Sequence, residues 1–120
     1  MQTPYFEFNP EKLKENYSEF EKVCEKHLKA FKIAYSVKTN TFIGVIETLM
    51  EIGSNFEVAS LEEIKKTNKK FMVFNGPAKT TQELKHAIKN KFLINIDSKS
   101  EIDKLSKILN GKEYNLGLRV

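Results

Sequence analysis

The residue of this sequence best suited to covalent chemistry is Lys38, because of the segment in which it lies. Residues 33–38 alternate, with the two-residue period of a β-strand, between a bulky apolar set and a small set that ends in the lysine. A neutral amine attacks carbonyl carbon, and desolvation or nearby cations favour the neutral form. The pattern predicts a strand with helices behind its bulky face and a carbonyl-capturing lysine at the carboxyl end of its other face.

Other polar residues are placed in a similar way along the chain. Asn75, Asp97 and Arg119 lie near the carboxyl ends of three later apolar runs, on the face opposite the bulky residues. Glu57 lies on a comparable face but earlier in its run. Barrel enzymes build their sites from residues at the carboxyl ends of parallel strands. The spacing therefore predicts that these side chains gather with Lys38 at one edge of a sheet, although polar strand ends are common in any α/β protein.

The elements that would position these residues alternate between short apolar runs and capped helices. Asn9 and Pro10 predict the start of a helix that runs to about Lys29, and Gly53 predicts the left-handed end of a second helix. Three later helices begin at capping boxes, in which a serine or threonine and the glutamate three residues on satisfy each other's backbone donors. The boxes are Ser60–Glu63, Thr80–Glu83 and Ser98–Glu101. Strand and helix units that alternate in this way require parallel strands with right-handed crossovers.

The predicted fold class is α/β, the amino-terminal part (about five strands) of a parallel (β/α)8 TIM barrel. The expected strands cover residues 33–38, 56–59, 71–74, 92–96 and 115–120. A barrel of this type closes with eight strands in roughly 250 residues. We therefore expect the chain to be the first part of a larger protein, truncated within its fifth strand. Because both sheet edges are unpaired, we expect the 120 residues by themselves to fold poorly or only as an oligomer.

Composition and charge exclude several other classes of function. The net charge is +4 and the pI about 9.1, but the lysines are scattered through all helical segments and Arg119 is the sole arginine, so we predict no nucleic-acid partner. The apolar runs are too short to span a bilayer and no signal-peptide pattern is present, which favours a cytoplasmic protein without membrane contact. Apolar residues recur along the first helix at steps of three or four, so we expect one stripe to be buried: Leu13, Tyr17, Phe20, Cys24, Leu28 and Phe31. The single Cys24 falls on this stripe and indicates core packing. His27 has no partner at metal spacing, so no metal site is predicted, and His86 is assigned no role.

The segment Tyr35–Asn40 resembles the cofactor-lysine strand of the pyridoxal-phosphate (PLP) decarboxylases for diaminopimelate, ornithine and arginine, which commonly reads Tyr-Ala-Val-Lys-Ala-Asn. The resemblance continues in order through nearly the whole chain. Its further matches are Gly53, residues 56–60, Glu63, and residues 75–80, 96–98 and 118–120. Related alanine racemases carry Ala-Tyr-Gly-His-Gly after the lysine and asparagine, whereas Thr-Phe-Ile-Gly follows here, which favours the decarboxylase branch.

The resemblance implies a role for particular residues. Lys38 would be the catalytic residue and would bind PLP as a Schiff base, and Glu57, Glu63 and Arg119 would be further cofactor-binding residues. Glu57 stands where the family generally has aspartate, and Arg119 matches an arginine that bonds the phenolic oxygen of the ring. The capping box alone explains Glu63, and we give that interpretation the greater weight. Lys79 matches a family lysine for which the spacing indicates no role. Asp97 and Ser98 are adequately explained as cap residues.

The resemblance also implies the organisation and the activity of the protein. Residues 1–9 would be a leading strand of a carboxyl-terminal β domain, and residues 10–120 a partial PLP-binding barrel domain. The protein would be a homodimer that decarboxylates an amino acid (diaminopimelate, ornithine, arginine or a related one) in lysine or polyamine biosynthesis, and this chain alone would be inactive. Two alternatives stay open: a non-catalytic decarboxylase-like regulatory protein, and a PLP-dependent racemase or PLP carrier on the same barrel.

Overall fold

Five short parallel strands form one sheet in the part of the chain that the computed structural model describes, residues 3–67 and 71–120. Their order in the sheet is their order in the sequence, which confirms the predicted parallel α/β architecture. The strands are β1 (Ala34–Ser36), β2 (Asn55–Val58), β3 (Met72–Phe74), β4 (Leu93–Ile96) and β5 (Leu116–Leu118). Sequential order with parallel pairing is the arrangement of consecutive strands in a TIM barrel.

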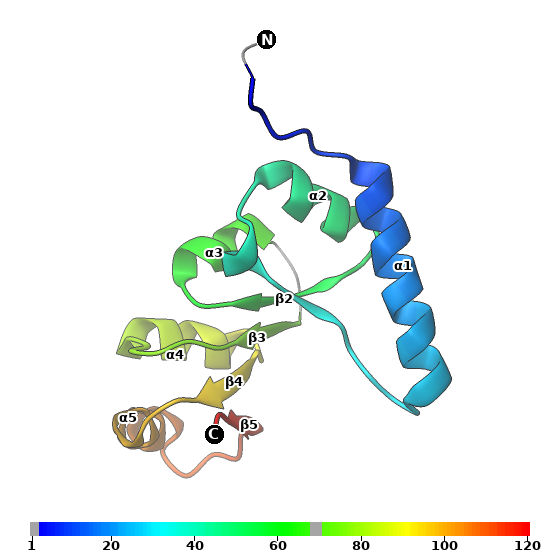
Figure 1. The fold of residues 1–120 in the computed structure, drawn as a ribbon. Helices are drawn as coiled ribbons and strands as arrows, with labels where there is room; N and C mark the ends of the chain where they lie inside the picture. Colours follow the sequence, from blue (N-terminus) through cyan, green and yellow to red (C-terminus); the bar gives the residue numbers. More distant parts are fainter. Residues whose placement is uncertain (1–2, 68–70) are drawn as a thin grey trace.

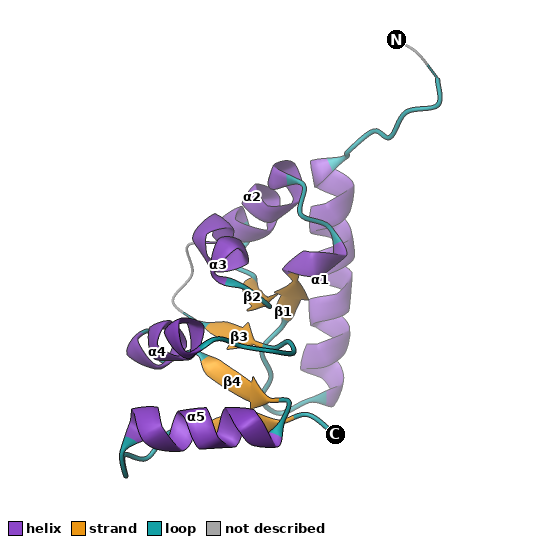
Figure 2. Ribbon diagram, turned by 90° about the vertical axis from the view of Figure 1, so that its left-hand side faces the viewer, coloured by secondary structure: helices purple, strands orange, loops and turns teal. Residues whose placement is uncertain are grey.

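A helix follows each of the first four strands and returns the chain to the other end of the sheet (Figure 1). The helices are α1 (Pro10–His27), α2 (Ile43–Glu51), α3 (Leu61–Thr67), α4 (Thr81–Lys89) and α5 (Lys99–Leu109), and a 3-10 turn, η1 (Val37–Thr39), follows β1. Helices α2 to α5 lie on the same side of the sheet, and α1 runs beside α2 at the β1 end (Figure 2). Gly53, with φ of +80°, follows α2 in the predicted left-handed conformation.

The two faces of the sheet differ in burial. The face under the helices carries large apolar side chains that are at most 1% exposed: Phe56, Val58, Met72, Phe74 and Ile94. The other face, here called the open face, consists of Ser36, Glu57, Val73, Leu93, Asn95 and Gly117, which are half-buried. Strand pairing aligns these residues, since Ser36 lies opposite Glu57, Glu57 opposite Val73, and Asn95 opposite Gly117. The predicted division into a bulky face and a small or polar face is therefore confirmed for β1 and β2, whereas Val73 and Leu93 place apolar side chains on the open face of β3 and β4.

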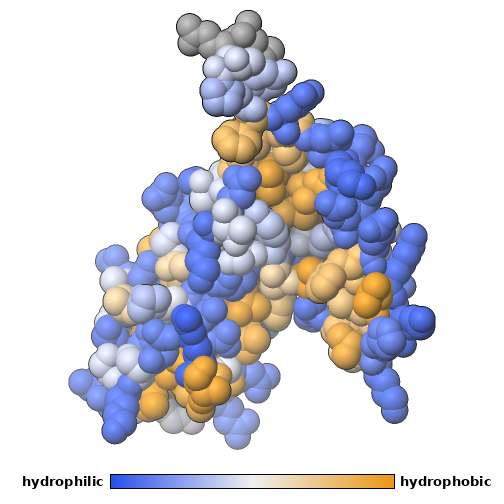
Figure 3. All heavy atoms as spheres, in the orientation of Figure 1, coloured by the Kyte–Doolittle hydropathy of each residue, from blue (hydrophilic) through white to orange (hydrophobic). Residues whose placement is uncertain are grey.

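Helix α1 differs from its prediction. Its apolar stripe was expected to be buried, but no residue of α1 is buried. Leu13 and Tyr17 pack partly against the core, whereas Phe20 is 58% exposed and Cys24 is only half-buried. The reason is that α1 lies at the β1 edge, beyond which the described sheet has no further strand for the stripe to cover. Apolar atoms are accordingly visible at the surface near α1 (Figure 3).

The amino-terminal residues also differ from expectation. No strand is present in residues 3–9, for which we expected one. A strand exists only with a hydrogen-bonded neighbour, and the expected neighbour was a separate β domain. The division at residue 9 therefore stays a prediction. The sheet itself is open at β1 and β5, and the radius of gyration of 16.6 Å exceeds the roughly 14 Å of a compact chain of this length.

The start of α4 carries the capping box that the sequence predicts. The Thr80 hydroxyl accepts a bond from the Glu83 N–H (3.2 Å), and a carboxylate oxygen of Glu83 accepts bonds from the Thr80 N–H (2.8 Å) and hydroxyl (2.9 Å). Burial raises the pKa of Glu83, but the hydrogen bonds from Thr80 outweigh it, so the pKa lies below its ordinary value. The stabilisation from the ionised carboxylate is therefore present above the ordinary pKa and lost as pH falls through the lowered one.

We expect Thr80→Ala to lower the free energy of unfolding by about 1 kcal/mol at neutral pH, because one side of the capping box is lost. The difference from the wild type should narrow in acid, where Glu83 is protonated in both proteins. Urea unfolding at several pH values measures both effects. The matched control is Thr81→Ala at the first helical position, which should change little. A Thr80→Ala effect no larger than that of Thr81→Ala would contradict the prediction.

Candidate active site

Lys38 lies just beyond the carboxyl end of β1, in the 3-10 turn η1. We predicted it within the strand, and this is corrected: strand pairing stops at Ser36, and the chain turns before the lysine. The Lys38 side chain is 54% exposed, and its Nζ lies 3.9 Å from Oε1 of Glu57. The amine therefore lies at the carboxyl edge of the sheet, as predicted, and can be reached from solvent.

Glu57 comes from the third position of β2, where its side chain points to the open face. That side chain is 14% exposed, and Oε1 accepts no hydrogen bond within the described structure. Ser36 is its direct neighbour across the β1–β2 pair. A carboxylate this buried and only distantly paired is costly unless another group reaches it. The structure therefore brings Glu57 and Lys38 together, although Glu57 lies earlier in its strand than the other polar residues.

Among the described residues, three buried polar atoms without a hydrogen-bond partner lie on neighbouring strands or directly after one: Ser36 Oγ, Glu57 Oε1 and Asn75 Oδ1. Asn75 follows β3, and its N–H continues the ladder to Val58 O at 2.9 Å. Because side chains alternate, Asn75 shares the open face with Val73, the partner of Glu57. Buried polar atoms are nearly always bonded, so three together indicate a place for water or ligand. Sequence reasoning missed Ser36, whose only signal was its small size.

Arg119 and Asp97 form an ion pair at the ends of β5 and β4, with 3.5 Å between Nη1 and Oδ1. The Arg119 N–H donates to Ile96 O at 3.0 Å, so its backbone continues the strand ladder. The sequence explained Asp97 as a cap residue, but Ser98 is the N-cap of α5 and the Asp97 carboxylate reaches Arg119 instead. The guanidinium, with its side chain 51% exposed, therefore lies at the same carboxyl edge as the other predicted side chains.

Glu63 makes the contacts of a cap. Its Oε2 accepts the Ala59 N–H at 2.7 Å, and its own N–H donates to the Ser60 hydroxyl at 3.2 Å. The side chain thus reaches one residue further back than in the predicted box. This confirms the interpretation to which we gave the greater weight, while a role beside a cofactor stays a prediction.

Lys79 is a buried residue of this edge that sequence reasoning left without a role. Its side chain is 0% exposed and forms an ion pair of 3.0 Å with Glu101, whose side chain is 1% exposed. The two residues belong to separate units of the chain, the β3–α4 loop and α5. Their spacing in sequence carries no signal for the contact, so it could be found only in three dimensions.

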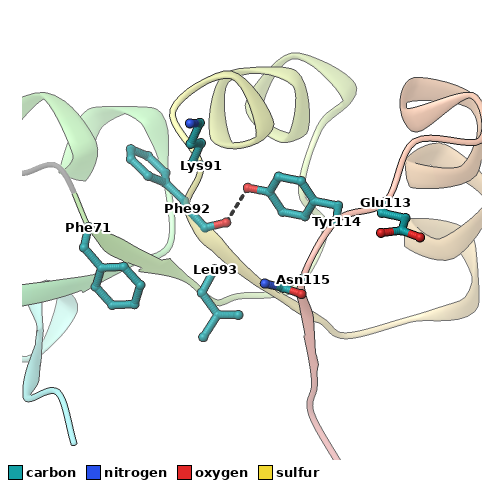
Figure 4. A pocket seen from close by; sticks show the side chains of 7 residues that line it. All are labelled: Phe71, Lys91, Phe92, Leu93, Glu113, Tyr114 and Asn115. Carbon is teal, nitrogen blue, oxygen red and sulfur yellow. Dashed lines mark hydrogen bonds between the residues drawn. The ribbon is translucent and has the colours of Figure 1, made fainter.

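A cavity lies at the opposite end of the sheet from Lys38. Seven residues line it at the amino ends of β3, β4 and β5: Phe71, Lys91, Phe92, Leu93, Glu113, Tyr114 and Asn115 (Figure 4). The Tyr114 hydroxyl donates to Phe92 O, and burial raises the pKa of Tyr114. Sites of parallel barrels lie at the carboxyl ends of the strands, so this cavity is separate from the candidate site.

Two further classes of site have no support in the described residues. Within residues 3–67 and 71–120, no group of three or more His, Cys, Asp or Glu side chains is placed to hold a metal ion. Nor does any helix of this part of the chain combine the length and the apolar character that a membrane span needs.

Comparison with known proteins places this arrangement in context. Residues 11–120 match the family model described as "Pyridoxal-dependent decarboxylase, pyridoxal binding domain". The diaminopimelate decarboxylase of Vibrio cholerae is 30% identical over 112 residues, 88% of this chain and 26% of the relative. Antizyme inhibitor 2 of Xenopus laevis is 30% identical over 97 residues, 71% of this chain and 21% of the relative.

Among solved structures, the fold is similar to that of diaminopimelate decarboxylase from Helicobacter pylori complexed with L-lysine. The TM-score is 0.87 at 21% identity, and the match covers 100% of this chain and 32% of the other. At this identity the similarity shows the fold alone. It agrees with the barrel architecture that the sequence predicts. The chain spans less than a third of the length of each of these relatives.

Proposed function

Because this chain belongs to the pyridoxal-dependent decarboxylase family, matching its pyridoxal-binding domain over residues 11–120, we propose that the protein decarboxylates an amino acid with PLP bound at Lys38. The observation that carries the proposal is the Lys38 amine, which lies at the carboxyl edge of the sheet 3.9 Å from a Glu57 oxygen. Such a lysine must be accessible to the carbonyl compound, and an adjacent base can take the proton that the amine loses. Lys38 and Glu57 meet both conditions.

The residues at this edge fit the cofactor. PLP carries an aldehyde that reacts with an amine, a phenolic oxygen that accepts a hydrogen bond, and further polar substituents. When bound, it supplies a conjugated ring that takes up the electron pair left by departing carbon dioxide. Lys38 offers the amine and Arg119 a donor cation. The unpartnered atoms of Ser36, Glu57 and Asn75 offer hydrogen bonds that no described protein group satisfies.

The roles of the protein groups follow from their contacts. Lys38 would hold the cofactor through its amine, and the Glu57 carboxylate, whose Oε1 lies 3.9 Å from Lys38 Nζ and accepts no hydrogen bond in the described structure, would be available to take a proton from it. Asp97 holds the guanidinium of Arg119 through Nη1. The other N–H groups of the guanidinium would be able to donate to an anionic oxygen of the cofactor. Glu63 acts through the cap, where it fixes the turn between β2 and α3.

The substrate we propose is an amino acid with a second charged group at its far end, such as diaminopimelate, lysine, ornithine or arginine. The names of the relatives support this class, since they include diaminopimelate decarboxylases and a structure complexed with L-lysine. A place in lysine or polyamine biosynthesis, assembly as a homodimer and a cytoplasmic location are parts of the same proposal.

A regulatory relative without activity is the second candidate. The match to antizyme inhibitor 2 favours it, because the name of that relative describes an inhibitor and not a decarboxylase. A protein that only binds a partner has no need of an exposed amine beside a buried carboxylate. The Lys38–Glu57 pair therefore supports the enzyme over the regulator.

The test is to add PLP to the complete protein, reduce it with borohydride and map the peptides, and in parallel to measure carbon dioxide release from the four amino acids named above. We expect a pyridoxyl group on Lys38 and release from at least one substrate. Label without release from any of them would favour the regulatory candidate, and exchange at the α-carbon without release would favour a racemase. Absence of label at Lys38 would overturn the proposed cofactor site.

A further inference from the structure

The Lys79 ammonium lies at the centre of a buried hydrogen-bond network at the edge of the sheet. Its Nζ donates to Gly76 O at 2.6 Å, to Asn95 O at 2.8 Å and to the two carboxylate oxygens of Glu101 at 3.2 and 3.0 Å. Lys104 Nζ in turn donates to Lys79 O at 3.0 Å. An ammonium has three donors, so every proton of this buried cation has an acceptor.

The acceptors belong to three separate elements. Gly76 lies in the loop after β3, directly beside Asn75, whose Oδ1 is buried and unpartnered. Asn95 belongs to β4, and Glu101 to the first turn of α5. One side chain therefore joins the carboxyl ends of two neighbouring strands to the start of a helix. All three points lie at the edge that carries the candidate site.

Glu101 extends the network towards the site. Its Oε2 also accepts the Asp97 N–H at 3.0 Å, and the Asp97 carboxylate pairs with Arg119 at 3.5 Å. The Arg119 guanidinium is thus connected to the Lys79 ammonium through Glu101 and Asp97. The link consists of side-chain and backbone groups whose positions are set by charge-assisted hydrogen bonds.

Stability alone is a poor explanation for the pair. Removing two charges from water is expensive, and well-packed apolar residues often replace a buried ion pair without loss of stability, whereas removal of one partner leaves an unpaired buried charge. A buried network that is fully satisfied does, however, hold its members in one arrangement. The pair is therefore suited to fixing geometry.

We propose that Lys79 and Glu101 are positioning residues that hold Asp97, and through it Arg119, in the orientation that binds the cofactor. Both side chains are at most 1% exposed, so they would act through their hydrogen-bond partners and not by direct contact with the cofactor. Lys79 fixes the loop after β3 and the end of β4, and Glu101 fixes the Asp97 backbone from which the carboxylate reaches Arg119. The part of the proposal that concerns PLP rests on the proposed function.

The test compares Lys79→Met, Glu101→Leu and the double variant in the complete protein, with two readouts. Each single variant should lower the urea midpoint, because it leaves a buried charge unpaired, and the double variant should recover most of that loss. The dissociation constant for PLP in the double variant should nevertheless remain raised by about tenfold, because Asp97 is no longer held. The control is Lys66→Met, which removes an exposed ion pair with Glu62 and should change neither readout.

Arg119→Ala completes the cycle. If the pair acts through Arg119, adding the double variant to Arg119→Ala should weaken PLP binding no further. Additive weakening would overturn the proposal, and so would a double variant that binds PLP as tightly as the wild type. The first outcome would mean that the pair acts on PLP by another route, and the second that it is merely structural.

A second measurement tests the proposal without the cofactor and without Lys79→Met or Glu101→Leu, which can impair folding. In Glu101→Gln, which removes the charge but keeps the shape, hydrogen exchange of the Arg119 amide, bonded to Ile96 O, should be about tenfold faster than in the wild type. Unchanged exchange would overturn the proposal. If the wild type binds no PLP at all, the proposed function fails, and this exchange rate decides the positioning role alone.

Discussion

Carbon dioxide release should fall by at least about a thousandfold when Lys38 is replaced by alanine in the complete protein, which corresponds to about 4 kcal/mol of lost transition-state stabilisation. The reason is that Lys38 is an exposed amine at the carboxyl edge of the sheet, with Oε1 of Glu57 3.9 Å from its Nζ. The absorbance of the covalently held cofactor should disappear with it. Steady-state release of carbon dioxide and an absorbance spectrum with added PLP measure the two effects.

Two control variants separate chemistry from charge and from folding. Lys38→Arg keeps a cation near Glu57 but cannot capture a carbonyl, so it should be as inactive as the alanine variant. Lys66→Ala removes a lysine of an exposed ion pair on α3 and should leave turnover and absorbance as in the wild type. Substantial activity or an unchanged cofactor spectrum in Lys38→Ala would sink the proposed function, provided that circular dichroism shows a folded protein.

The largest effect on stability is expected for Phe74→Ala. Phe74 is 0% exposed, lies on the helix side of β3 and belongs to the core formed with Phe56, Ile94 and Leu84. Truncation of a buried phenylalanine removes its transfer free energy and leaves a cavity, at a cost of about 3–5 kcal/mol. Lys79 Nζ also lies 5.7 Å from the Phe74 ring centroid, so the loss reaches the positioning pair. Urea unfolding followed by circular dichroism measures the change.

Phe74→Leu provides the graded control, since it keeps most of the apolar volume and should cost clearly less than the alanine variant. The slope of the urea transition should be the same in all three proteins, because the surface exposed on unfolding is nearly unchanged. A loss below about 1 kcal/mol for Phe74→Ala would contradict the assignment of this ring to the core.

Local patterns were enough to predict much of the fold. Alternation in the apolar runs separated the helix-facing side of the strands from the open face, because side-chain direction in a strand depends only on position. The Thr80–Glu83 box located the start of α4 correctly, since its partners are three residues apart and need no distant contact. The same reasoning placed Lys38, Asp97 and Arg119 at the carboxyl edge, and the strand ends of the structure agree.

The sequence failed where a residue depends on its distant neighbours. The stripe of α1 was predicted to be buried because periodicity identifies an apolar face but not what covers it. Asp97 was explained as a cap residue, but Ser98 is the N-cap of α5 and the Asp97 carboxylate pairs with Arg119, which follows the next strand. The turn at Lys38 was missed because Val37–Thr39 contains neither glycine nor proline, the residues that most often end a strand.

The sequence by itself determined the order of the helices and strands from α1 to β5 and the polar positions at the carboxyl edge of the sheet, and it predicts Lys38 as the reactive amine. Only the tertiary structure decided which side chains meet: Lys38 with Glu57 across two strands, and Lys79 with Glu101 at a separation of 22 residues. The physical reason is that periodicity and capping depend on residues within one or two turns of each other. A buried charge, by contrast, needs a partner that can lie far away in the sequence. The partner of a buried charge is therefore chosen by the packing of the whole sheet.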